Sequence, residues 1–294
     1  SGPVISGATS GGYRGKDLKD TNWVASSMEH YFNEPAAGDT NGICTSQTTS
    51  AAANLTLNGA LTATINGNSV YAPSQSSTAA TADQAWARRI GVTSSGNDSG
   101  ITFTVTGTDV DGKALSETIT GPNSTVAYTG GTVAALFKTV TKIATSAATT
   151  GNITVGTASV SAHLYARPIG ILPYQSSISN IKVMMIEALD SATTDVLEIG
   201  QSDDQDSFAD IATAVCQAVT TTANTGGAVT VDATQSAAWR SVSQSDTGSD
   251  SVAYNSDVQV VMTLTPSGTL ATAGIGYISV DFMQGRNLVA GETW

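Results

Sequence analysis

Four aspartates lie within eight residues of each other in the second half of the chain and have the chemistry to bind a metal ion. They are Asp203, Asp204, Asp206 and Asp210, in the segment SDDQDSFADIATAVCQAV. Carboxylate oxygens are ligands that Ca²⁺ takes in proteins. Acids also stabilise the first turn of a helix, because they face the positive end of its dipole. The segment therefore predicts one short helix, and metal binding by the four aspartates is the weaker alternative.

A second pair of acids, Asp109 and Asp111, stands in the stretch ITFTVTGTDVDGKALSETITG, residues 101–121. Their spacing matches the first two ligands of an EF-hand loop. However, a glycine follows Asp111 directly, and the sixth residue after that glycine is Thr118 instead of a glutamate. Asp-Gly is typical of a hairpin turn, because glycine takes positive φ. The stretch predicts a hairpin turn, with a metal loop as the alternative.

Residues for acid–base or nucleophilic catalysis are scarce. His30 and His163 are the two histidines, and the chain contains no G-x-S-x-G motif. The segment SGGYRGKD imitates a phosphate-binding loop, but Ser10 replaces the first glycine and Asp17 follows the lysine. We predict no enzyme, no catalytic residue and no cofactor, although two acids on different strands could still form a glycosidase-like pair.

Alternation along residues 101–121 predicts two strands with one buried face. Ile101, Phe103 and Val105 share one parity, and threonines occupy the other. Threonine is β-branched and presents a neutral hydroxyl group to water or to a neighbour. In the return strand Glu117 has the inward parity, so we expect a bulge or an edge position there.

Regular strand signals separated by Gly, Asn and Ser predict an all-β fold. We expect two jelly-roll-like β-sandwich domains, at 46–166 and 167–294, with a linker at 167–170. An irregular N-terminal arm, residues 1–45, precedes them, with a short helix about residues 24–32 as an option within it.

Charge and composition exclude several classes of protein. The 294 residues include 12% charged residues, and the net charge is −12 with a pI of about 4.3, so we expect no nucleic-acid partner. Residues 187–257 contain twelve acids and one base, which makes the second half a solvated acidic body. No run of about eighteen apolar residues occurs, so we expect no membrane span, and SGPVISG lacks the pattern of a signal peptide.

The two cysteines, Cys44 and Cys216, are too far apart for a zinc motif, and two cysteines are too few for a dense disulfide framework. Two buried free thiols and a single long-range disulfide both fit this spacing.

Residues that could bind a partner protein concentrate in the arm. They are Tyr13, Arg14, Trp23, Tyr31 and Phe32. Large aromatic residues and arginine are common anchors of protein interfaces, although aromatics in an arm also pack on their own domain. The densely cationic segment AWARRI, residues 85–90, is either a solvated turn or a site for an anionic partner.

The run GVTSSGNDSGITFTVTGTDVDGKALSETITGPNSTVA, followed by LFKTVTKIATSAATTGNITVGTA, resembles a module of virion structural proteins of tailed phages. The arm, from GGYRGKDLKDTNW to TSAAANLTLNGAL, resembles the start of the same proteins, so the resemblance covers roughly residues 10–160. The segments DVLEIGQSDDQDSFADI and ATAGIGYISVDF are similar to sandwich domains of phage head-decoration and fibre-type proteins.

The resemblance implies a capsid decoration or cement protein that binds the major capsid protein and stabilises the head. We expect a homo-trimer or another cyclic oligomer, made in the host cytoplasm and located on the outer surface of the phage head. The first domain would contact the capsid or another subunit, and the acidic domain would face outward. The alternatives are a tail, connector or fibre component, or an adhesin that binds the host surface.

Overall fold

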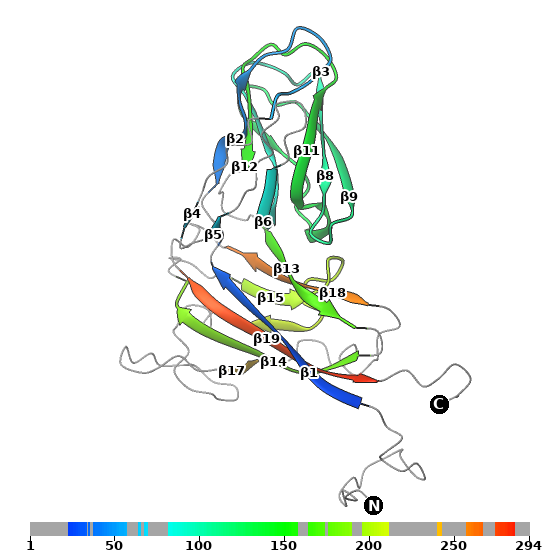
Figure 1. The fold of residues 1–294 in the computed structure, drawn as a ribbon. Helices are drawn as coiled ribbons and strands as arrows, with labels where there is room; N and C mark the ends of the chain where they lie inside the picture. The colour runs from blue at the N-terminus through cyan, green and yellow to red at the C-terminus, as the bar shows by residue number, and fades with distance from the viewer. Residues whose placement is uncertain are drawn as a thin grey trace, which may run out of the picture.

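The structure, a computed structural model, shows a nearly all-β chain, as predicted (Figure 1). It describes residues 23–33, 35, 38–57, 64–65, 68–69, 82–157, 164–173, 176–189, 196–211, 240–242, 257–266 and 274–285. The strands form two sandwich-like units, each built of two facing sheets. In Figure 1 one unit lies above the other; we call the upper one the first sandwich and the lower one the second sandwich. None of the described residues forms a helix long and apolar enough to cross a membrane.

The first sandwich packs a four-stranded sheet against a larger one. The smaller sheet has the order β10 (Val126–Tyr128), β7 (Gly91–Ser94), β12 (Ile153–Thr157), β2 (Asp39–Gln47). Facing it lie β6 (Ala82–Arg88), β11 (Phe137–Thr145), β8 (Thr102–Thr108) and β9 (Ala114–Thr120), and β3 (Ala53–Asn54) pairs with β11. Apolar side chains such as Val92, Phe103 and Ile143 fill the space between the sheets.

The second sandwich has the same two-layer construction. One sheet has the order β1 (Trp23–Asn33), β19 (Ile275–Gly285), β14 (Ser176–Glu187), β17 (Arg240–Val242). The other has the order β16 (Ala209–Ile211), β15 (Val196–Gly200), β18 (Val258–Thr265), β13 (Tyr165–Leu172). The core between these sheets includes Phe32, Trp86 and Ile199. A short two-stranded sheet elsewhere joins β4 (Thr64–Ile65) to β5 (Asn68–Ser69).

The two sandwiches are joined through their larger layers. Strand β6 of the first pairs with β13 of the second at one position, Ala87 with Ala166, so the sheet continues from one sandwich into the other. A small apolar cluster surrounds this position and includes Val110, Leu136 and Val261. Burial of this cluster holds the two halves against each other.

The predicted hairpin of residues 101–121 is confirmed. Strands β8 and β9 pair in antiparallel register from Thr102 opposite Thr120 to Thr108 opposite Ala114. In the turn, Asp109 Oδ1 accepts hydrogen bonds from the backbone N–H groups of Asp111 and Lys113, both at 2.9 Å. Gly112 has φ of +79°, the left-handed conformation that the turn requires.

Several local expectations are wrong. Residues 23–33 and 39–47 of the supposed irregular arm are strands, and the optional helix about 24–32 is β1, which completes the second sandwich beside β19. Residues 202–208 form a loop and 209–211 form β16, so no helix begins there; residues 212–219 lie outside the described part. The supposed linker at 167–170 lies inside β13.

Candidate protein-interaction surface

The outer face of the β9–β8–β11 layer is covered with hydroxyl groups, and we call it the threonine face. Its members lie on three neighbouring strands: Thr102, Thr104, Thr106, Thr108, Ser116, Thr118, Thr120, Thr139 and Thr141. On β8 these threonines alternate with buried residues, so the sequence period was sufficient to place them.

Hydrogen bonds between hydroxyl groups link the strands of the threonine face. The Oγ1 atoms of Thr104 and Thr118 lie 2.9 Å apart, and those of Thr108 and Thr139 lie 2.7 Å apart. Thr141 Oγ1 donates to the Thr106 carbonyl oxygen at 3.2 Å. These bonds, together with the restricted χ1 of threonine, make the face stiff, so little side-chain entropy would be lost on binding.

The acid of strand β9 is directed away from the threonine face. Glu117 has the inward parity on β9, which lies at the edge of its sheet, so the edge alternative is confirmed. Its Oε2 atom accepts a hydrogen bond from the Gly130 N–H at 2.6 Å. The charge of Glu117 is thereby satisfied at the rim. The threonine face itself carries one charged side chain, the exposed Lys142 of β11, which pairs with Thr106.

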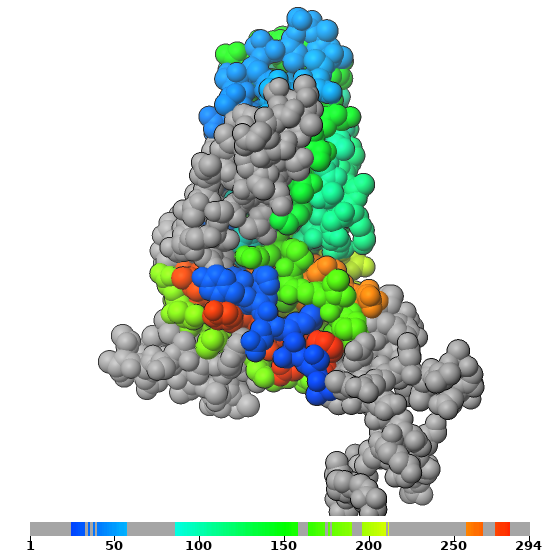
Figure 2. All heavy atoms as spheres, in the orientation of Figure 1, coloured from blue at the N-terminus to red at the C-terminus, as the bar shows by residue number. Residues whose placement is uncertain are grey.

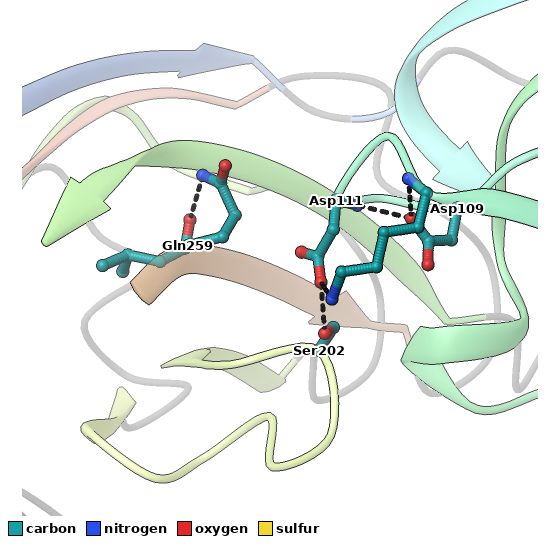
Figure 3. A network of polar contacts seen from close by, with 6 residues as sticks. Asp109, Asp111, Ser202 and Gln259 are labelled. Atoms are coloured by element: carbon teal, nitrogen blue, oxygen red, sulfur yellow. Dashed lines mark hydrogen bonds and ion pairs between the residues drawn. The ribbon is translucent and has the colours of Figure 1, made fainter. Parts of the chain in front are cut away.

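The tip of the β8–β9 hairpin contacts the second sandwich (Figure 3). Asp111 Oδ2 accepts hydrogen bonds from Ser202 Oγ at 2.7 Å and from Lys113 Nζ at 3.0 Å. The hydrogen bond and the charge of Asp111 raise the pKa of Lys113. Because Asp111 belongs to the first sandwich and Ser202 to the second, the hydrogen bond between them links the hairpin tip to the second sandwich.

The second acidic cluster forms a structural loop. The carbonyl oxygen of Asp204 accepts hydrogen bonds from the N–H groups of Gln201 at 2.8 Å and Ser207 at 3.4 Å. Asp203 and Asp206 lie in the same loop, and Asp210 follows in β16, opposite Glu198. In the part of the chain that the structure describes, no group of three His, Cys, Asp or Glu side chains is arranged to hold a metal ion.

Asp98 is a buried carboxylate that the sequence did not single out. It is 2% exposed and accepts hydrogen bonds from Ser94 Oγ at 2.5 Å and from the Thr150 N–H at 2.6 Å. Burial by itself would raise the pKa of Asp98, but its hydrogen bonds outweigh burial and leave the pKa below its ordinary value. Asp98 ties the β7–β8 loop to the β11–β12 turn, whose residues lie about fifty positions away in sequence.

The cationic segment at 85–90 is neither a solvated turn nor an open anion site. Arg88 is 2% exposed, and its guanidinium lies 5.2 Å from the centre of the Tyr165 ring. Arg89 donates from Nε to the Thr129 carbonyl oxygen at 2.8 Å and lies 5.3 Å from the centre of the Tyr128 ring. Both arginines are therefore used inside the fold.

The proposed partner anchors have different environments. Tyr31 is 41% exposed on β1, and its ring centre lies 5.1 Å from that of Tyr277 on β19. Phe32 is 1% exposed in the core of the second sandwich, so its side chain packs inside the chain. Trp23 is the first residue of β1, and nothing is described of its side chain; Tyr13 and Arg14 lie outside the described residues.

The histidines and cysteines are the remaining candidates for catalysis. His30 lies partly buried near Arg167, and burial and this positive charge lower its pKa to about 4. Cys44 has a free, buried thiol whose pKa burial raises to about 12, and His163 and Cys216 lie outside the described part. Neither described group has the pKa of a catalyst near neutral pH.

One groove of about 260 Å³ lies on the outer face of the smaller sheet of the first sandwich. It is lined by Thr40, Gly91, Thr93, Thr125, Val126, Tyr128 and Gly156. These residues include no carboxylate, so the groove does not hold the acid pair of a glycosidase. No protein-family model, no curated protein and no solved structure matches this chain.

Proposed function

We propose that this chain is a structural protein of a tailed-phage virion, a capsid decoration protein that binds the major capsid protein through its threonine face. The single observation that carries the proposal is the hydroxyl ladder across β9, β8 and β11, exemplified by the contacts between Thr104 and Thr118 and between Thr108 and Thr139. The resemblance of residues 10–160 to virion structural proteins supports the same role.

Charge makes the threonine face the suitable surface for contact. The chain carries a net charge of −12, of which residues 187–257 contribute −11. The threonine face carries one charged side chain, Lys142, beside its hydroxyl groups, and a surface with so few charges can lie against another protein at a low cost of burying unpaired charges. The acidic second half keeps favourable hydration when it faces outward. In this role the chain is a homo-trimer or another cyclic oligomer on the outside of the head, made in the host cytoplasm.

Binding to capsid shells that lack the protein tests the role of the threonine face. We expect Thr104→Lys combined with Thr118→Lys to lower affinity for the shells at least about tenfold, because two ammonium groups would be desolvated at the contact. The matched control, Thr104→Ser with Thr118→Ser, keeps both hydroxyl groups and should bind. Unchanged affinity of the lysine variant, with its fold verified by circular dichroism, would contradict this contact.

Copy number in purified virions separates decoration from the alternative roles. A decoration protein covers the whole shell, so the chain should be present in hundreds of copies per particle by gel-band quantification. A few copies would indicate a tail, connector or fibre component. Absence from virions, together with binding to host-cell glycans, would indicate an adhesin.

A further inference from the structure

Apolar and aromatic side chains form a patch on the outer face of the β1–β19–β14 sheet, which we call the tyrosine patch. Tyr31, Tyr277 and Met184 occupy one row across the three strands, because Tyr277 pairs with both of the others. Ile275 lies two residues before Tyr277 and pairs with Glu187 across the bulge that contains Ile186.

The tyrosine patch is accessible along one border of this sheet. Tyr31 is 41% exposed and Ile186 is 43% exposed. Phe32 and Ile278, which follow Tyr31 and Tyr277 in sequence and point to the other face of the sheet, are buried in the core. Figure 2 shows the strands β1 and β19 side by side on this face of the molecule. Clustered apolar side chains on a surface are typical of a protein contact, in contrast to single scattered ones.

The row next to the tyrosine patch carries one charge of each sign. Glu29 on β1, Ser279 on β19 and Lys182 on β14 lie opposite one another in the sheet. Glu29 is exposed, and Lys182 Nζ lies 2.6 Å from Asp281 Oδ2. The acid and the base thus lie on the two strands that flank β19, with a neutral, buried serine on β19 between them.

We propose that this sheet packs face to face on the same sheet of a second copy, related by a two-fold axis that runs parallel to β19. Such an axis exchanges the positions of β1 and β14, so Glu29 of each copy lies opposite Lys182 of the other. In the same way Tyr31 lies opposite Met184, and Tyr277 packs on its own equivalent. Packing of two sheets with nearly aligned strands is a common arrangement in β proteins.

The positions of the charged residues favour a two-fold axis parallel to the strands over one perpendicular to them. An axis perpendicular to the strands through Ser279 would place Glu29 against Glu29 and Lys182 against Lys182, and like charges in contact disfavour association. With the parallel axis Asp281 approaches its own equivalent. Lys182 Nζ at 2.6 Å and the Ser279 hydroxyl at 3.1 Å both bind Asp281, so they partly offset this approach of like charges. Each Lys182 is then shared between Asp281 of its own chain and Glu29 of the second copy.

The size of the face predicts a moderate affinity. Strands β1 and β19 have 11 residues and β14 has 12. At about 3.3 Å per residue and about 4.8 Å between strands, the face covers roughly 500 Å² on each copy. This is at the low end for specific interfaces, so we expect a dissociation constant of roughly 10–100 µM. The association does not depend on whether the chain belongs to a virion.

Sedimentation velocity of the full chain between about 1 and 300 µM tests the proposal. We expect wild type to pass from monomer to dimer over this range, and Tyr277→Lys to stay monomeric. Glu29→Lys and Lys182→Glu should each weaken dimerisation at least about tenfold, because each creates like-charge contacts on both sides of the axis. Lys142→Glu, the same change of charge on an exposed residue of β11, should dimerise like wild type.

Mixing the two charge variants is the decisive measurement. In a mixed dimer the lysine introduced by Glu29→Lys would oppose the glutamate introduced by Lys182→Glu. On the other side of the axis, native Lys182 of the first variant would oppose native Glu29 of the second, so an equimolar mixture should regain dimer formation. Circular dichroism and thermal melting of each variant establish that it is folded. The proposal is overturned if folded wild type remains a monomer at about 300 µM, if Tyr277→Lys dimerises normally, or if the mixture stays monomeric.

Discussion

Arg88 and Tyr165 lie opposite each other next to the position at which the described strands β6 and β13 join the sheets of the two sandwiches. The guanidinium of Arg88 lies 5.2 Å from the centre of the Tyr165 ring, and Ala87 pairs with Ala166 beside them. On the other side of this position Arg167 lies 6.0 Å from the centre of the Trp86 ring. Two cation–π contacts thus flank the junction, and burial strengthens such contacts because the cation is desolvated.

Replacement of Tyr165 by leucine should separate the unfolding of the two sandwiches. The change removes a buried ring and its cation–π contact, at a cost of about 3 kcal/mol. Because Tyr165 belongs to the core of the second sandwich, we expect that sandwich to melt roughly 10 °C below its wild-type temperature. Differential scanning calorimetry measures this effect. Tyr165→Phe keeps the ring and should melt close to wild type; a Leu variant with an unchanged thermogram would contradict the role of this contact.

Asp98→Asn should destabilise the first sandwich by about 1–3 kcal/mol, because the hydrogen bonds from Ser94 and Thr150 lose their charged acceptor. The pKa of Asp98 in the folded chain lies below its ordinary value of 3.8. The unfolded chain therefore binds the proton first, and the stabilisation is complete above pH 3.8 and lost as the pH falls below that value. Urea unfolding at a series of pH values measures it. If the variant shows the same acid-dependent loss below pH 3.8 as wild type, Asp98 is not its source.

His30 should make stability depend on pH in a separate, higher range. Its pKa is about 4 in the folded chain, compared with 6.5 ordinarily, because of burial and the charge of Arg167. Between these values the unfolded chain binds a proton that the folded chain does not, so stability is complete above pH 6.5 and decreases as the pH falls toward 4. Since His30 is only partly buried, we expect a loss on the order of 1 kcal/mol. His30→Leu should abolish this loss in urea unfolding between these pH values; its persistence in the variant would assign it to other groups.

Gly107→Ala should disrupt the pairing of β8 with β11. A Cβ atom at Gly107 would overlap the carbonyl oxygen of Thr139, which is backbone and cannot rotate away. We expect a loss of about 3 kcal/mol or more in guanidinium unfolding. Gly100→Ala is the matched control, because a Cβ there meets no atom within 4 Å, and it should be nearly neutral. Equal stability of the two variants would show that the strands separate without cost at Gly107.

Local patterns were sufficient for the elements whose contacts are close in sequence. The alternation at 101–121 and the Asp-Gly turn predicted the β8–β9 hairpin, because its two strands and its turn are neighbours along the chain. The inward parity of Glu117 likewise indicated a bulge or an edge position, and β9 lies at the end of its sheet. The aspartates at 203–206 misled the prediction, because acids that suit a helix start also occur in loops, and pairing of Leu197 with Ile211 favours a strand.

The interactions that hold the candidate surfaces depend on contacts distant in sequence. Asp98 accepts a hydrogen bond from Thr150, 52 positions away, and the sequence around Asp98 contains no pattern that predicts this contact. The tyrosine patch requires β1 and β19, which stand near opposite ends of the chain, to lie side by side. No local period encodes such a pairing, since strand propensity is the same whichever strand becomes the neighbour.

The amino-acid sequence by itself determined the strand period, the hydroxyl groups on the outward positions and the concentration of negative charge in the second half. These properties are sums or local alternations, which are present before the chain folds. The tertiary structure alone decided that Arg88 packs on Tyr165, that Phe32 is core while Tyr31 is surface, and that Glu29 and Lys182 share a row. Those relationships arise when distant strands pair and bury their apolar faces together, because only pairing sets which side chains become neighbours.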